Sequence, residues 1–424
     1  MASAAEKFWQ HGVRMFMDAA REGDMAEIKR LLIFDTESLL IGAEDEDDTT
    51  ALMYAALNGQ LDVMRLLLDH PSAGAMMVLA SSGLKALMLA ALCGHVDAMR
   101  LLLDHPSANP AVMVMQQAPD GATALMDAAG NGQVDAMRLL LDHPSADAAS
   151  MMMAVDEYGK TALSHAAWYN HVNAMHVLLD HPSADPEAMI VLTDGTGSSA
   201  LMWAAGHGNV DAMRLLLDHP SSNAASMMMA VDKHGETALI HAACHNHVNA
   251  MHVLLDHPSA DPEPMIVLPD DTGSSAFMWV SGHGNVDAMR LLLDHPSADP
   301  AVMMMQTTAV GLTALMMAAR SGHADAMRLL LTHPSADPSV MIALRNSKND
   351  CALTMAALHA AGHSSSDSWR PLLFLMRWIA MEPQPCNAQR ARMTKVLETL
   401  CTVRCSRALF DSGQPDTPDA GRRT

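Results

Sequence analysis

Apolar residues recur at helical spacing in short segments of this chain, and polar residues mark where each segment begins and ends. In one such segment, Thr313 is suited to begin a first helix, because its hydroxyl can accept a hydrogen bond from a free backbone amide. Met327, Leu330 and Leu331 then form one apolar stripe on a second helix, at positions i, i+3 and i+4. Pro334 ends that helix, since proline has no amide hydrogen to donate. The pattern predicts a helix, a turn and a second helix.

The same segment repeats along the chain at a nearly constant interval. The histidine after the second predicted helix lies at positions 70, 105, 143, 181, 219, 257, 295 and 333, so the interval is 35 residues once and 38 residues six times. The alanine that begins the first predicted helix keeps the same rhythm, at positions 51, 86, 124, 162, 200, 238, 276, 314 and 352. A length of 424 residues alone suggests about two or three domains. Two markers in phase indicate instead one unit copied end to end.

A third part of each unit follows the second helix. It contains a short apolar run, such as residues 189–192 or 303–305, and then a polar turn with a glycine, such as residues 156–159. We predict that these runs are strand-like and that each unit is helix, turn, helix and extended finger. Neither helix can bury its apolar stripe alone, so neighbouring units must stack against one another.

The repeated residues resemble the ankyrin-repeat family. The resemblance is carried by Gly-Lys-Thr-Ala-Leu-Ser-His-Ala-Ala at 159–167, by Thr-Ala-Leu-Met-Met-Ala-Ala at 313–319 with Gly-His at 322–323, and by the leucines of every second helix. It covers roughly residues 11–363. The resemblance implies an all-α ankyrin-repeat solenoid of about nine to ten helix-turn-helix units with extended β-hairpin-like fingers. It also implies that partners bind on the concave face formed by the fingers and first helices.

Two features depart from the family pattern. The family period is about 33 residues, whereas the interval here is 38, and we assign the extra length to the finger. A longer finger would add either binding surface or strand–strand contacts between repeats, and the sequence leaves both open. The proline and histidine of the family's Thr-Pro-Leu-His are here alanine and, in most repeats, methionine, which favours apolar packing over a histidine hydrogen bond. These methionines are Met53, Met88, Met126, Met202, Met278 and Met316.

The two ends of the chain differ from the array. We predict an N-terminal extension at 1–10, the array at 11–363, a degenerate repeat with a helical C-terminal cap at 364–410, and a disordered tail at 411–424. Within the cap, residues 388–409 have the apolar spacing of an amphipathic helix. A cap suits this position because the terminal repeats of a solenoid need a polar outer face.

Charge narrows the classes of partner. The chain has 48 Asp and Glu against 26 Lys and Arg, a net charge of −22. Such an excess of acid argues against nucleic-acid binding, which requires clustered basic residues, and favours a protein partner with basic patches. No apolar run reaches the roughly 18 residues of a membrane helix, and the six cysteines form no paired motif. We therefore expect no membrane contact and a cytoplasmic monomer, with the nucleus as a second possible location.

No catalytic motif is present, and we predict that the protein is not an enzyme and holds no cofactor. The 23 histidines and the methionine runs raise the alternative of metal storage or sensing. Equivalent histidines in stacked repeats would lie about 8–10 Å apart, too far to share one zinc ion. His241 and His245 are the better pair, at i and i+4, but a full ligand set is not evident. We predict no metal site and interpret the methionine runs as core residues.

A tandem duplicate supplies the candidate site. Residues 149–224 and 225–300 align without gaps and differ at 15 positions. Five of these pairs lie at the finger tip or the end of the first helix, where proteins similar to ankyrin repeats contact partners, and two of them exchange opposite charges. Either the two copies present different contacts to partners, or exposed positions have changed freely while core positions have not. The candidate residues are Glu157, Tyr158, Lys160, Trp168 and Tyr169, with their counterparts Lys233, His234, Glu236, Cys244 and His245.

We therefore predict a non-catalytic scaffold that binds a protein partner on the concave face of the array. The alternative is a substrate-recognition adaptor subunit of an enzyme complex such as a ubiquitin ligase. In that case the repeats would hold the substrate, and residues 364–410 would dock the enzyme.

Overall fold

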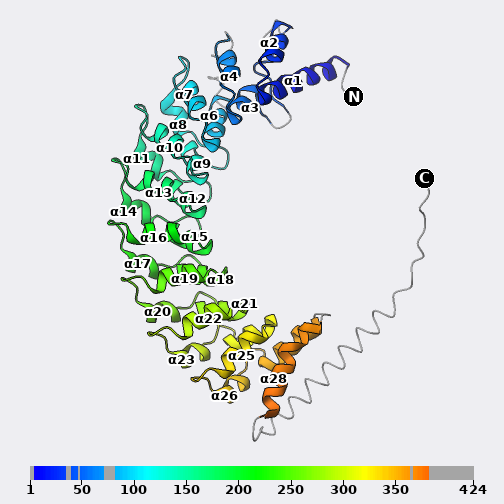
Figure 1. The fold of residues 1–424 in the computed structure, drawn as a ribbon, viewed down its shortest axis with the longest axis vertical. Coiled ribbons are helices and arrows are strands. Elements are labelled where there is room, and N and C mark those ends of the chain that lie inside the picture. Colours follow the sequence, from blue (N-terminus) through cyan, green and yellow to red (C-terminus); the bar gives the residue numbers. More distant parts are fainter. Residues whose placement is uncertain (1–3, 35–39, 46–47, 71–81, 363–365, 382–424) are drawn as a thin grey trace, which may run out of the picture. The chain divides into compact units, whose positions relative to one another are not determined.

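The computed structural model describes residues 4–34, 40–45, 48–70, 82–362 and 366–381. It divides into two compact units, Met1–Lys233 and His234–Thr424. Each unit is a stack of short helices, and the described residues contain only isolated β-bridges in place of strands (Figure 1). None of the described helices has the length and apolar character needed to cross a membrane.

The repeat contains three helices. In residues 162–191 these are α12 (Ala162–Trp168), α13 (Val172–Leu179) and α14 (Pro186–Val191). The prediction that residues 189–192 and 303–305 are strand-like is wrong, since they lie almost entirely in α14 and in α23 (Pro300–Met305). Asp185 caps α14 by accepting a hydrogen bond from the amide of Ala188 at 3.2 Å, and proline occupies the first turn. The third helix therefore takes up part of the length that we assigned to the finger.

The remaining helices of the first unit follow the same order. They are α1 (Ala4–Glu22), α2 (Met25–Phe34), α3 (Ala51–Leu57), α4 (Leu61–Leu68), α6 (Ser82–Cys93), α7 (Val96–Leu103), α8 (Pro110–Met115), α9 (Ala124–Gly130), α10 (Val134–Leu141), α11 (Ala148–Met153), α15 (Ala200–Gly206), α16 (Val210–Asp218) and α17 (Ala224–Met229). Because α1 begins at Ala4, most of the segment predicted as an N-terminal extension belongs to the first helix.

The second unit repeats this arrangement and ends in a longer helix pair. Its elements are α18 (Ala238–Cys244), α19 (Val248–Leu255), α20 (Pro262–Val267), α21 (Ala276–His283), α22 (Val286–Leu293), α23, α24 (Ala314–Ser321), α25 (Ala324–Thr332), α26 (Pro338–Ala343), α27 (Ala352–Gly362), the 3₁₀ helix η1 (Ser366–Trp369) and α28 (Arg370–Met381). Helix α28 packs against α25 and α27 through buried Leu372, Leu375 and Ile379. The amphipathic helix predicted at 388–409 and the tail at 411–424 lie outside the described residues.

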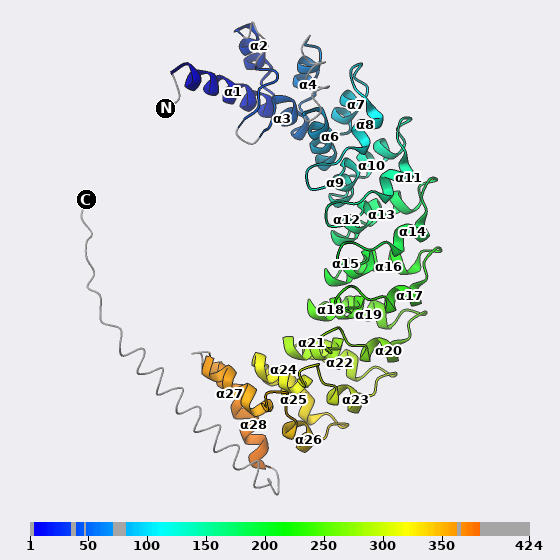
Figure 2. The ribbon, with the colours of Figure 1, turned by 180° about the vertical axis from the view of Figure 1, so that it is seen from behind.

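The helices of the first unit form three rows. Figures 1 and 2 show α9, α12 and α15 along one side, α10, α13 and α16 in the middle, and α11, α14 and α17 along the other side. Ala166 and Ala167 of α12 and Met175 and Leu178 of α13 have no exposed surface, so the first two rows bury a continuous apolar core. Alanines in the first row allow close approach of neighbouring first helices, while leucine and methionine fill the space behind them.

The fingers contact one another through the backbone. In the first unit the amide of Glu157 donates to the carbonyl of Asp120 at 2.9 Å, and the amide of Gly195 donates to the carbonyl of Tyr158 at 2.6 Å. Gly159 has a φ of 80°, and a Cβ there would lie only 2.6 Å from the amide nitrogen of Gly195. The fingers thus form contacts between repeats while leaving side chains at their tips exposed, such as those of Glu157 and Tyr158.

Histidines after the second helices also connect repeats. In His105, Nε2 donates to the carbonyl of Leu68 in the preceding repeat at 3.2 Å, while Nδ1 accepts from the amide of Ser107 at 3.2 Å. His105 thereby supplies a hydrogen-bond donor to the carbonyl of Leu68, which lies at the end of α4 and has no donor within that helix. This histidine thus joins the ends of the second helices of two neighbouring repeats.

Candidate partner-binding site on the first helices and fingers

The candidate residues of the first copy lie together on the first unit, on the surface formed by first helices and finger tips, which we call the first-helix face. Glu157, Tyr158 and Lys160 come from the finger before α12, Trp168 is the last residue of α12, and Tyr169 is its C-cap. Thr161 caps the helix by accepting from the amide at position 164, which fixes where the finger ends and the helix begins.

Two tryptophans stack at the centre of this face. The rings of Trp168 and Trp203, from α12 and α15, have centroids 4.3 Å apart and planes inclined by 25°. The ammonium nitrogen of Lys160 lies 3.8 Å from the centroid of Trp168 and 4.1 Å from that of Trp203. The imidazole of His207 lies 4.4 Å from the Trp168 ring. The cluster is a cation–π arrangement with the lysine over both indoles.

Trp203 and His207 were not among the predicted residues. Both are identical in the second copy, as Trp279 and His283, so a comparison of the copies cannot single them out. The signal that could have found Trp203 is its position as the fourth residue of a first helix, one repeat beyond His165.

A finger aspartate orients Trp203. Asp194 Oδ2 accepts a hydrogen bond from Trp203 Nε1 at 2.9 Å, while Oδ1 accepts from the amides of Thr196 and Ser198 at 2.8 and 3.0 Å. The same spacing of nine residues joins other finger acids to their first helices. These pairs are Asp45 with Tyr54 at 2.7 Å, Asp156 with His165 at 3.0 Å and Asp270 with Trp279 at 2.9 Å. The finger therefore sets the orientation of a polar or aromatic side chain on the first-helix face.

Lys160 is partly buried, and its pKa is lower than that of an exposed lysine. Burial among the indoles lowers its pKa by desolvating the ammonium, while the nearby carboxylates of Asp194 and Asp156 act in the opposite direction. The side chain is therefore part of the packed cluster rather than a solvated surface charge.

Two tyrosines beside this cluster are open to solvent. Tyr158 exposes 63% of its surface and Tyr169 exposes 58%. A hydrogen bond with Glu157 raises the pKa of Tyr158, so this phenol is a neutral donor at physiological pH. Exposed aromatic side chains on an ordered scaffold are typical of protein interfaces.

The candidate residues of the second copy are divided between the two units. Lys233 is the last residue of the first unit, where its Nζ donates to the carbonyl of Gly195 at 2.7 Å. Glu236 and Cys244 lie in the second unit with Trp279, which keeps its hydrogen bond to Asp270.

The remaining contacts of the second unit involve imidazole and thiol groups. His241 Nε2 lies 3.7 Å from Glu236 Oε2, and burial raises the pKa of the Cys244 thiol above its usual range. His234 and His245 are exposed, and His245 Nδ1 donates to the carbonyl of His241 at 3.1 Å. His245 thus caps its own helix end.

An unpredicted acid lies on the same face one repeat earlier. Asp127 occupies the position equivalent to His165, and its finger has Ala118 where the fingers of the next four repeats have aspartate. Burial, with the charge of Asp120 nearby, raises the pKa of Asp127 to about 7.

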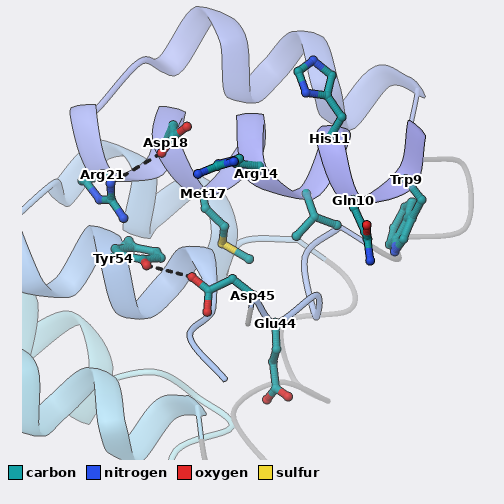
Figure 3. Close-up of a pocket in the computed structure, with 11 residues that line it drawn as sticks. Trp9, Gln10, His11, Arg14, Met17, Asp18, Arg21, Glu44, Asp45 and Tyr54 are labelled. Carbon is teal, nitrogen blue, oxygen red and sulfur yellow. Dashed lines mark hydrogen bonds and ion pairs between the residues drawn. The ribbon is translucent and has the colours of Figure 1, made fainter. Parts of the chain in front are cut away.

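The N-terminal end of the first unit carries a cavity of about 860 Å³ between α1 and the segment before α3 (Figure 3). Its lining includes Trp9, Arg14 and Arg21 from α1, and Asp45 and Tyr54 on the opposite wall. The Arg21 guanidinium lies 4.3 Å from the centroid of the Tyr54 ring, whose hydroxyl donates to Asp45. The cavity extends the aromatic and charged character of the first-helix face toward the N-terminus.

The family model for ankyrin repeats, which describes three copies of the repeat, matches residues 16–114, 109–190, 189–266 and 264–342. These matches cover more than half of the chain, and the protein belongs to the ankyrin-repeat family. The predicted all-α repeat fold is thereby confirmed. Proteins of this family are generally protein-binding modules and typically non-catalytic scaffolds. No curated protein matches the chain.

Proposed function

We propose that this protein is a non-catalytic scaffold that binds a protein partner on the first-helix face, the surface expected to be concave in the family. The observation that supports this most is the aromatic cluster of Trp168 and Trp203 with Lys160, flanked by exposed Tyr158 and Tyr169. Tryptophan, tyrosine and cationic side chains contribute most of the binding energy in protein interfaces, and here they are already held in place.

Charge defines the complementary surface of the partner. The net charge of −22 favours a partner with basic patches, and its association should weaken as salt screens the attraction. A cytoplasmic monomer that binds neither nucleic acid nor membrane is part of the same proposal.

The test compares two faces of the same repeats. Replacing Tyr158, Trp168 and Tyr169 by alanine should remove partners recovered by affinity purification with mass spectrometry. A matched control replaces Met153 and Val191, which are exposed on the third helices, and should leave recovery unchanged. Equal recovery with both variants, at low and at high salt, contradicts the proposal.

One observation supports the adaptor alternative. Leu373 of α28 exposes 60% of its surface, although its neighbours Leu372 and Leu375 are buried against the last repeats. An exposed leucine here offers a second contact, distant in sequence from the first-helix cluster. Replacing Leu373 with aspartate should then remove one set of partners and leave those that depend on Trp168. If the Leu373 variant keeps all partners, the adaptor alternative is contradicted and the scaffold proposal remains.

A further inference from the structure

The two copies of the duplicate differ in a coordinated way around one retained tryptophan. In the first copy the Lys160 ammonium and the Trp168 ring cover Trp203. In the second copy the equivalents of Lys160 and Trp168 are Glu236 and Cys244, while the equivalent of Trp203 is still tryptophan, Trp279. One cation and one aromatic plane have thus been replaced together by an acid and a small side chain.

The second copy keeps the geometry that presents this tryptophan. Trp279 Nε1 donates to Asp270 Oδ2 at 2.9 Å, the same distance as between Trp203 and Asp194. His283 again lies beside the tryptophan at the helix end, with ring centroids 6.0 Å apart. The orientation of the indole is therefore the same, and what differs is the side chains beside its face.

Two acids of the second copy lie near the retained tryptophan and the helix that ends at Cys244. Asp270 accepts the hydrogen bond of Trp279, and Glu236 lies two residues before the start of α18. Burial, together with the charges of Glu236 and Asp270, raises the pKa of the Cys244 thiol. Glu236 Oε2 is also 3.7 Å from His241 Nε2, which places it at the edge of α18 rather than in open solvent. A carboxylate held at a partly buried position is screened less than one on an open surface.

We infer that Trp279, Glu236 and Cys244 form a binding site for an arginine side chain of the protein partner. The guanidinium plane would stack on Trp279 as the Trp168 ring stacks on Trp203, and Glu236 would accept its hydrogen bonds. Cysteine in place of tryptophan leaves the volume that the planar group needs. The first copy supplies its own cation, whereas the second copy is complementary to a cation from outside. This inference rests on the proposed function, because it names the chemistry by which a partner is recognised on the first-helix face.

The experiment uses the full chain and defined peptides. A fluorescein-labelled Gly-Ser peptide with spaced arginines is titrated by fluorescence anisotropy, beside the same peptide with citrulline or with lysine. The arginine peptide should bind most tightly, because citrulline has the same shape without the charge and lysine lacks the planar group. Glu236→Lys and Trp279→Leu should each weaken arginine-peptide binding about tenfold.

Matched variants separate the site from overall charge. Glu263→Lys makes the same change of charge at an exposed position of α20 and should leave the affinity within about twofold. In the first copy, Lys160→Glu combined with Trp168→Cys removes the internal cation and the indole that covers Trp203. This double variant should create a second arginine site, raising the stoichiometry from one to two. Arg214→Glu, exposed on α16, should leave the stoichiometry at one. Circular dichroism establishes whether each variant is folded. If Trp279→Leu does not fold, Glu236→Lys alone tests the arginine site.

Equal binding of the arginine and citrulline peptides overturns the inference, as does a loss with Glu263→Lys equal to that with Glu236→Lys. If the lysine peptide binds as tightly as the arginine peptide, the proposed stacking of a guanidinium on Trp279 is wrong. These results leave the proposed function intact if alanine at Tyr158, Trp168 and Tyr169 still removes partners. If that triple variant keeps its partners, the proposed function fails on its own evidence.

Discussion

The two copies of the duplicate, residues 149–224 and 225–300, differ mainly along their first helices and fingers, differ at four positions at or near the third helices, and are identical along their second helices. Helices α13 and α19 have the same sequence, and so do residues 210–217 and 286–293 of the next repeat. The fifteen differing pairs include Glu157/Lys233 and Lys160/Glu236, which exchange charge. The second row of helices therefore acts as a fixed support, and the first-helix side carries most of the variation.

The differences are not confined to exposed positions. Four of the differing pairs are buried in both copies, and in all four the second copy has the larger side chain. These pairs are Ser164/Ile240, Leu201/Phe277, Ala204/Val280 and Ala205/Ser281. Free change of exposed residues over an unchanged core does not account for them. The first helices have been repacked together with the surface that they present.

The second helices α13 and α19, which have the same sequence, should contribute equally and strongly to stability. Leu178 in α13 and Leu254 in α19 occupy equivalent positions with no exposed surface. Replacing either with alanine should lower the free energy of unfolding by about 2–5 kcal/mol, through lost burial and the cavity left behind. Urea unfolding of both variants should give equal losses. Losses that differ by more than about 1 kcal/mol contradict an equivalent support in the two copies.

Asp127 extends the comparison to the repeat before the duplicate. Its pKa of about 7 in the folded chain is above the value near 3.9 of an unfolded aspartate. Ionisation therefore costs more in the folded state, and this residue should lower stability progressively as pH rises from about 4 to about 7.

The variant Asp127→Asn removes that cost. The free energy of unfolding of this variant should exceed that of the natural chain by almost nothing at pH 4 and by up to about 4 kcal/mol at pH 8. Asp135→Asn, at a position whose side chain is 81% exposed, should show no such dependence. If thermal unfolding shows the same stability difference between Asp127→Asn and the natural chain at every pH, the pKa of the Asp127 carboxyl is not raised in the folded state.

The finger aspartates should matter equally in the two copies. Asp194 and Asp270 each accept a tryptophan Nε1 hydrogen bond and two backbone amides of their own finger. Replacing either with alanine should cost about 1–3 kcal/mol, because buried donors lose their acceptor. Hydrogen exchange should accelerate at those finger amides in both variants. Protection lost in only one copy would contradict a common mode of presenting the tryptophan.

The smallest effect concerns the charge inversion itself. Lys160→Met removes the ammonium from the two indoles and should lower stability by about 1 kcal/mol or less. Glu236→Gln should change stability by less than that, since Glu236 belongs to an acidic cluster in an acidic chain. Paired thermal unfolding measurements check both, and a larger loss for Glu236→Gln than for Lys160→Met would contradict the larger stabilising role of the Lys160 cluster.

Sequence patterns predicted the repeat, the stacking and the first and second helices, because each leaves a periodic apolar signal. The third helix was missed because a six-residue apolar run, such as the one after Asp185, has the same composition in a strand and in a buried helix. The aspartate and proline at its start were the available signal. Tyr158 and Trp168 were identified because they differ between copies, whereas Trp203 does not, and only the structure shows it stacked on Trp168.

Site-specific photo-crosslinking determines whether partners bind on the first-helix face. Tyr169 on that face and Val191 on a third helix each expose 58% of their surface, so a benzophenone amino acid is equally accessible at both. Irradiation in cell extract should join a discrete partner to the chain labelled at 169 and none to the chain labelled at 191. A partner captured from 191 and not from 169 would place binding on the third helices and contradict the account.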